Sequence, residues 1–115
     1  MYGYHNQPSY PVGMLAVQPG EMMASVACLK IVLNGKGGHG SSPHLSVTPI
    51  GAACDIYKAL STLPSLEVNC KEKVVVSITK LNSGSRNNVI PRTAELEGTI
   101  RCFNSEVMEF VKKRV

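Results

Sequence analysis

Hydrophobic residues in this chain follow two different spacings, and the order of those spacings restricts the fold. They recur at every second position in 27–33, 74–78 and 94–100, which is typical of strands with one buried face. They recur at helical spacing in 50–60 and 107–111, which indicates two amphipathic helices. The chain therefore reads strand, helix, strand, strand, helix.

Local signals give approximate bounds for these elements. Thr48 can cap the first helix, Pro49 fits its first turn, and Pro64 is expected to follow its end. Asn104 or Ser105 can cap the second helix. The expected elements are a short strand at 14–17, a strand at 22–33, a helix at 46–63, strands at 73–81 and 94–103, and a helix after residue 104.

This order predicts an α+β fold of the ferredoxin-like (βαββαβ) type, an antiparallel sheet with two helices on one face. The last strand of that pattern is missing from this chain. The final helix carries Val107, Phe110 and Val111, which need a sheet face to cover. We therefore expect the chain to be part of a longer polypeptide.

Composition excludes several classes of function. Hydrophobic residues make up 43% of the 115 residues and charged residues 17%, which is typical of a globular domain rather than a disordered chain. The net charge of +4 is scattered, without the basic stripe and stacking aromatics of a nucleic-acid binder. No apolar run approaches the ~20 residues of a membrane span, and no signal peptide is present. The four cysteines have no CxxC spacing, so we expect reduced, mostly buried thiols.

A glycine-rich loop, 35–44, is the strongest candidate for chemistry. Its glycines allow a sharp turn and hold His39 at the end of a strand, where binding and catalytic side chains tend to lie. A histidine there can donate to a developing negative charge, bind a metal or transfer a proton. The alternative is a surface hairpin whose histidine has no function.

Three further residues are candidates, each with a structural alternative. His5 lies in an aromatic loop, Asn88 precedes a Val-Ile-Pro sequence, and Arg101 lies on the polar face of a strand, where its fork suits a carboxylate. No paired carboxylates, HExxH sequence or phosphate loop accompany them. One candidate ligand cannot hold a metal, so these residues alone do not predict catalysis by this chain.

The landmarks occur together, in order, in a known family. The chain resembles the central part of peptidase family M20, in its amidohydrolase and aminoacylase branch. The motifs that carry the resemblance are Tyr4-His5-Asn6, Pro19-Gly20-Glu21, Gly35-Lys36-Gly37-Gly38-His39-Gly40, Thr48-Pro49-Ile50, Asn88-Val89-Ile90-Pro91 and Gly98-Thr99-Ile100-Arg101.

The resemblance implies a division of the chain and roles for its residues. Residues 1–23 correspond to the end of the catalytic domain, and 24–115 to the dimerisation and lid domain, incomplete at its C-terminal end. His39 would polarise the scissile carbonyl in the partner's active site, and His5 would be a metal ligand. Asn88 and Arg101 would bind substrate. Arg92 departs from the family, in which an acidic residue is common at that position.

The whole enzyme would then be a homodimer, formed through the sheet edge and helices, that hydrolyses N-acyl amino acids or short peptides. It would use two divalent metal ions, zinc or else manganese or cobalt, with at most one ligand from this chain. From the scattered charge and from the lack of a signal peptide or membrane span, we expect no nucleic-acid or membrane partner and a cytoplasmic location. The other metal ligands and the catalytic glutamate are absent here, so this part alone should be inactive.

Two alternatives remain open at this point. The chain could be a stand-alone ferredoxin-like interaction module without catalysis, pairing through an exposed sheet edge. It could also be completed by another chain that supplies the fourth strand.

Overall fold

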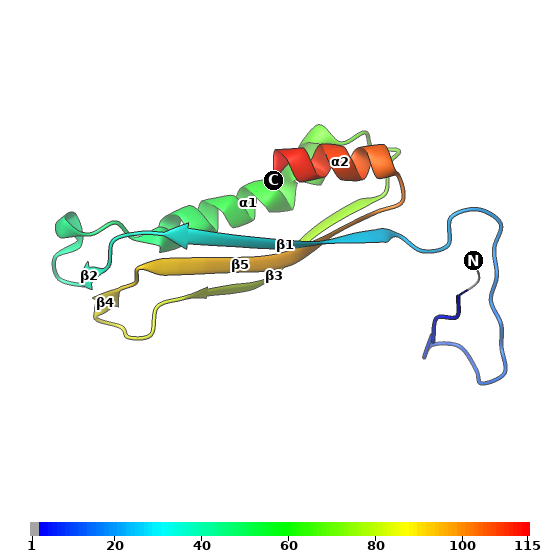
Figure 1. The fold of residues 1–115 in the computed structure, drawn as a ribbon, viewed down its shortest axis with the longest axis horizontal. Helices are drawn as coiled ribbons and strands as arrows, with labels where there is room; N and C mark the ends of the chain where they lie inside the picture. Colours follow the sequence, from blue (N-terminus) through cyan, green and yellow to red (C-terminus); the bar gives the residue numbers. More distant parts are fainter. Residues whose placement is uncertain (1–2) are drawn as a thin grey trace.

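Three long antiparallel strands form the main sheet of the computed structural model, which describes residues 3–115 (Figure 1). They are β1 (Ser25–Asn34), β3 (Val74–Ser83) and β5 (Thr93–Cys102), in the spatial order β1-β5-β3. Helices α1 (Pro49–Glu67) and α2 (Ser105–Arg114) lie on the same side of this sheet. The α+β class predicted from the sequence is confirmed.

The buried core lies between the helices and the inner face of the sheet. β5 is the central strand, and its inward residues alternate strictly with outward ones, as period-two spacing predicts. The helical spacing at 50–60 and 107–111 predicts apolar faces that include Ile50, Cys54, Tyr57 and Phe110, but these four residues are exposed. The helix residues that are buried instead face the sheet: Pro49, Ala53, Leu60, Leu63, Met108 and Val111.

The first helix is longer than its sequence signals predict. Thr48 caps it as expected, its Oγ1 accepting a hydrogen bond from the Ile50 N–H at 3.4 Å. Pro64 lies inside the helix instead of after it, so the predicted end at residue 63 is wrong. The last turn persists because the Val68 N–H donates to the Pro64 carbonyl and because Arg114 of α2 pairs with Glu67.

Two other expectations are wrong. Residues 14–17 form no strand, because no neighbouring strand among the described residues offers them backbone partners. All four cysteines are free thiols, but Cys28, Cys54 and Cys70 are exposed and only Cys102 is buried, so the expectation that most of them are buried is wrong. In residues 3–115 no helix is long and apolar enough to span a membrane.

Gly98 sets how closely β3 approaches β5. A Cβ at this position would lie 2.1 Å from the Ser77 carbonyl oxygen and 3.0 Å from the Ile78 Cα, so no side chain fits there. The β3 register slips between Ile78 and Lys80, directly opposite this glycine. The bulge and the glycine together let the two backbones pass at close range.

We expect Gly98→Ala to lower the free energy of unfolding by about 2 kcal/mol, the cost of overpacking a core. Gly51→Ala is the matched control, because Gly51 lies in α1 with open space around its Cβ position. That change should raise stability by up to about 1 kcal/mol through helix propensity. Urea unfolding of both variants, followed by circular dichroism, measures the effects. Equal stability of the two variants would contradict this account of the strand approach.

Candidate functional site

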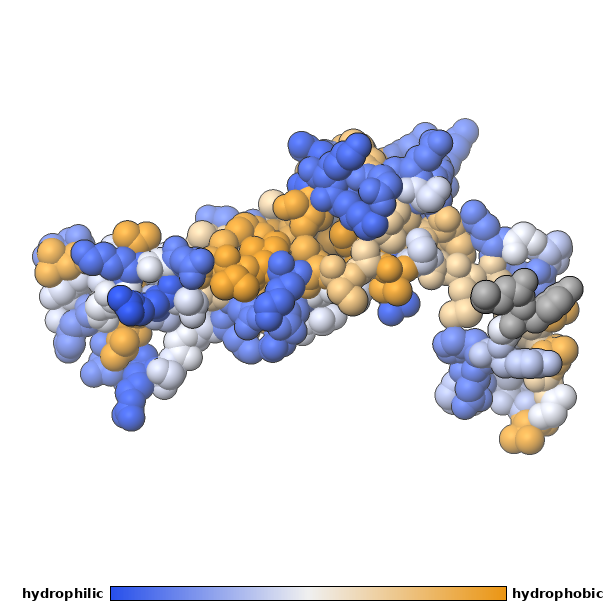
Figure 2. Space-filling view, in the orientation of Figure 1, coloured by the Kyte–Doolittle hydropathy of each residue, from blue (hydrophilic) through white to orange (hydrophobic). Residues whose placement is uncertain are grey.

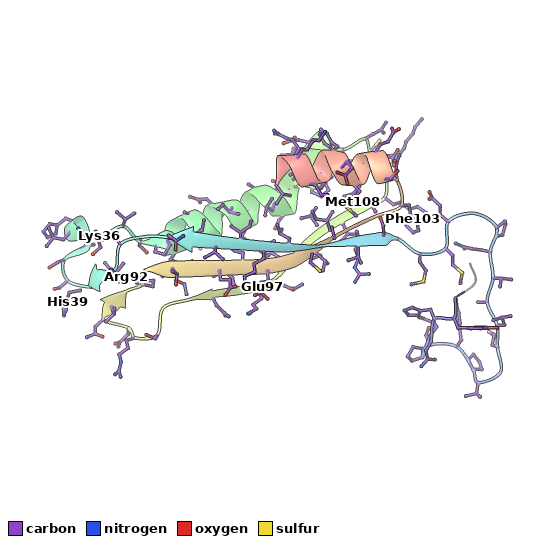
Figure 3. All side chains as sticks on the ribbon, viewed as in Figure 1. Lys36, His39, Arg92, Glu97, Phe103 and Met108 are labelled. Carbon is purple, nitrogen blue, oxygen red and sulfur yellow. The ribbon has the colours of Figure 1, made fainter. Side chains whose placement is uncertain are left out.

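The predicted site residues His39 and Asn88 meet at one end of the sheet, although 49 positions separate them in the chain. Two short strands that the sequence did not predict, β2 (Gly38–His39) and β4 (Val89–Ile90), pair antiparallel. Their register sets His39 opposite Val89, the residue after Asn88. Figure 3 places His39 at the end of the molecule away from Phe103 and Met108.

Glycines make this pairing possible. The Gly40 N–H donates to the Asn88 carbonyl at 2.8 Å, and a Cβ on Gly40 would come within 3.1 Å of that oxygen. A Cβ on Gly37 would lie 2.9 Å from the Ile90 carbonyl oxygen. The glycine-rich loop therefore lies against the 88–90 segment at a distance that side chains would prevent.

The loop is also closed at its base. The Lys36 and Val47 backbones exchange two hydrogen bonds of 2.9 Å, and the Gly35 N–H donates to the Arg92 carbonyl at 2.7 Å. The peptide hydrogen bonds of this end of the sheet thus hold both segments in one arrangement. His39 is exposed, but the backbone that carries it is fixed.

The surroundings of His39 select one tautomer of its ring. The Ser41 backbone N–H donates to Nδ1 at 3.2 Å, and the Ser41 Oγ lies 2.7 Å from the same nitrogen. A peptide N–H can only donate, so Nδ1 accepts and the proton of the neutral imidazole is on Nε2. The ring therefore presents an N–H to solvent, suited to donate to a carbonyl oxygen or an oxyanion.

A pocket of about 730 Å³ opens beside this ring. Residues of both loops and the start of β5 line it: Gly37, Gly38, His39, Gly84, Ser85, Val89, Ile90, Pro91, Arg92 and Thr93. Asn88 adjoins this lining through Val89, and its carbonyl is committed to Gly40. The pocket thus offers an N–H donor from His39 and a cation from Arg92.

Arg101 is not part of this pocket. It lies near the opposite end of β5, opposite Val26 of β1 and Val75 of β3. Eight residue steps separate it from Thr93 in the same strand, a span of about 26 Å at the usual strand rise. The structure therefore does not bring Arg101 together with His39 within one chain.

His5 is also distant from the pocket. It belongs to the exposed N-terminal segment, which leaves the sheet at the end opposite β2 (Figure 1). Within residues 3–115, no group of three or more histidine, cysteine, aspartate or glutamate side chains could hold a metal ion. This part of the chain therefore does not fit a metal centre of its own.

Sequence reasoning missed two features of the site. The first is Ser41, which orients the His39 ring. Its position two residues after the histidine was the only sign of this in the sequence, because such a spacing is typical of local side-chain to backbone hydrogen bonds. Arg92 was visible in the sequence only as an unusual residue after Pro91. Its place beside His39 depends on the β2–β4 pairing, which no periodicity reveals.

Comparison with known proteins adds a family match to this geometry. Residues 24–115 match the M20 dimer family, described as a peptidase dimerisation domain. N-acetylcysteine deacetylase of Bacillus subtilis is 42% identical over all 115 residues, which make up 30% of that protein. The chain thus spans about a third of the length of such a relative.

Solved structures give the same result. A protein from methicillin-resistant Staphylococcus aureus has a TM-score of 0.79 and 33% identity, covering 84% of this chain and 26% of that one. A dinuclear metal-binding peptidase of family M20 from Bacillus subtilis has a TM-score of 0.63 and 37% identity, covering 96% of this chain and 25% of that one.

Proposed function

We propose that this chain, which belongs to the M20 peptidase dimerisation-domain family, is the dimerisation and lid part of a larger hydrolase. That hydrolase would cleave the amide bonds of N-acyl amino acids or short peptides. The observation that carries this proposal is the His39 imidazole, fixed as an Nε2–H donor above a pocket. Such a donor can polarise a scissile carbonyl and stabilise the oxyanion that forms on it.

The proposed division of the chain assigns 24–115 to the dimerisation domain and 1–23 to the end of the catalytic domain. The first part of this division coincides with the matched residues. Apolar side chains in the N-terminal segment support the second part, because Val12, Leu15 and Val17 are at least 74% exposed. Side chains of this kind normally pack against further protein.

Each candidate residue of this chain would have a separate role toward the substrate. His39 would donate from Nε2 to the carbonyl oxygen of the substrate, and Asn88 would bind substrate beside it. Arg101 would hold the free carboxylate of the amino acid as a bidentate partner. Because Arg101 lies about 26 Å along β5 from the His39 end, we propose that each active site takes His39 from one subunit and Arg101 from the other.

The metal ions would be held mainly by other residues of the whole protein, and this chain would supply one ligand, His5. A dinuclear centre is named for the peptidase of known structure, and zinc, manganese or cobalt are our proposed ions. The homodimer would form through the sheet edge and helices. In residues 3–115, β1 and β3 each pair on one side only, which supports this surface.

We expect the whole protein to hydrolyse N-acetyl-L-amino acids when zinc or manganese is supplied, whereas residues 1–115 alone should not. Release of the free amine, followed with an amine-reactive dye, measures both. Hydrolysis by residues 1–115 alone would contradict the proposal that this chain lacks most of the catalytic centre. A stand-alone interaction module, the alternative, would leave the whole protein without hydrolysis of any N-acyl amino acid.

A further inference from the structure

Positive charge collects at the end of the molecule that carries His39. The segments 34–48 and 83–93 contain Lys36, Arg86 and Arg92 but no aspartate or glutamate. Figure 3 places Lys36, His39 and Arg92 together at this end, and Figure 2 shows strongly hydrophilic side chains there. This end therefore has a positive potential, whereas the formal charge of the whole chain is only +4.

The nearest acidic side chains on the sheet are already paired. Glu95 and Glu97 lie on the outer face, where Lys30 contacts both and Lys80 binds Glu97 at 3.1 Å. The hydrogen bond from Lys80 holds the pKa of Glu97 below its ordinary value, so this carboxylate stays ionised in its existing ion pairs. It is not a free partner for the cations at the His39 end.

Arg92 is the cation that faces the pocket. Its carbonyl oxygen accepts a hydrogen bond from the Gly35 N–H. Its Cγ lies 2.8 Å from the position that a Cβ on Gly37 would occupy. The backbone and the start of the side chain are thus held against the glycine-rich loop. Within residues 3–115, Arg92 has no ion pair. It lines the same pocket as His39, and Arg86 does not.

We propose that Arg92 forms an anion subsite beside His39 and selects substrates that carry a second carboxylate. This inference rests on the function proposed above. Arg101 would hold the first carboxylate from the other subunit, so Arg92 would bind a different group of the same molecule. The planar guanidinium suits a carboxylate, with which it can form two parallel hydrogen bonds. The second carboxylate belongs either to the acyl group or to the amino-acid side chain.

Two matched substrate pairs distinguish these positions in the whole enzyme. N-acetyl-L-glutamate against N-acetyl-L-glutamine tests the side chain, and N-succinyl-L-methionine against N-butyryl-L-methionine tests the acyl group. In one pair, Arg92→Gln should lower kcat/KM for the dicarboxylate by about 10- to 100-fold, as expected for a lost charged hydrogen bond. The neutral member of that pair should change by less than about twofold.

Arg86→Gln is the matched control, because it removes the same charge from the same end of the molecule. Arg86 lies in the β3–β4 loop and lines a neighbouring pocket instead of the one beside His39. This variant should leave both members of each pair within about twofold. If Arg92→Gln lowers kcat/KM equally for all four substrates, or if Arg86→Gln has the same effect as Arg92→Gln, the anion subsite is wrong. The proposed function would stand in that case, because the enzyme still hydrolyses these substrates. A wild-type enzyme that hydrolyses none of the four overturns the proposed function itself, and the subsite with it.

Discussion

His39→Ala in the whole enzyme should lower kcat by about 100- to 1,000-fold, the usual cost of removing one oxyanion donor. The Ser41 N–H keeps Nδ1 as an acceptor and so leaves the Nε2 proton available to the substrate. Alanine removes that donor without disturbing the β2–β4 pairing, which is made by backbone groups. Steady-state hydrolysis of an N-acetyl-L-amino acid measures the loss.

The control for this variant is His44→Ala. His44 lies in a short 3-10 helix, Pro43–Leu45, is exposed, and lines none of the pockets at this end. Its replacement should leave kcat within about twofold. Light scattering should give the same dimer mass for both variants, because neither residue lies in a long strand or an α-helix. A His39→Ala enzyme with kcat within a few-fold of wild type would remove His39 from the chemistry.

The long elements of this fold could be predicted because their burial is periodic. β5 alternates between inner and outer residues along its whole length, and the sequence shows the same alternation. The ends of helices are harder to predict, because a tertiary contact can extend a helix beyond its local stop signal. The pairing of Arg114 with Glu67 lies beyond Pro64, and nothing near Pro64 in the sequence announces it.

The candidate site was predictable in its residues but not in its assembly. Glycines around His39 and the loop character of 87–91 are visible in the sequence. Their contact is a ladder of only two residue pairs, too short to show a period. The exposure of Cys28 shows that an apolar neighbourhood is a weaker guide than phase. Cys28 lies within an apolar run, but out of phase with the alternation at 27–33, and is therefore on the outward face of β1.

The separation of His39 from Arg101 leads to the second large effect. If each active site takes His39 from one subunit and Arg101 from the other, His39→Ala and Arg101→Ala homodimers should each be severely impaired. A mixed dimer of the two should contain one site with both native residues and one site with neither. Random exchange in an equal mixture makes about half of the dimers mixed, so about a quarter of wild-type activity should return.

This value separates the proposed arrangement from its alternative. If one subunit supplied both residues to a given site, every site in a mixed dimer would lack one of them, and mixing would restore nothing. The measurement is activity after the two inactive enzymes are mixed, dissociated and allowed to reassociate, with each variant treated alone as the control. No recovery, together with mass evidence for mixed dimers, would show that the distance of about 26 Å along β5 is not bridged by the second subunit.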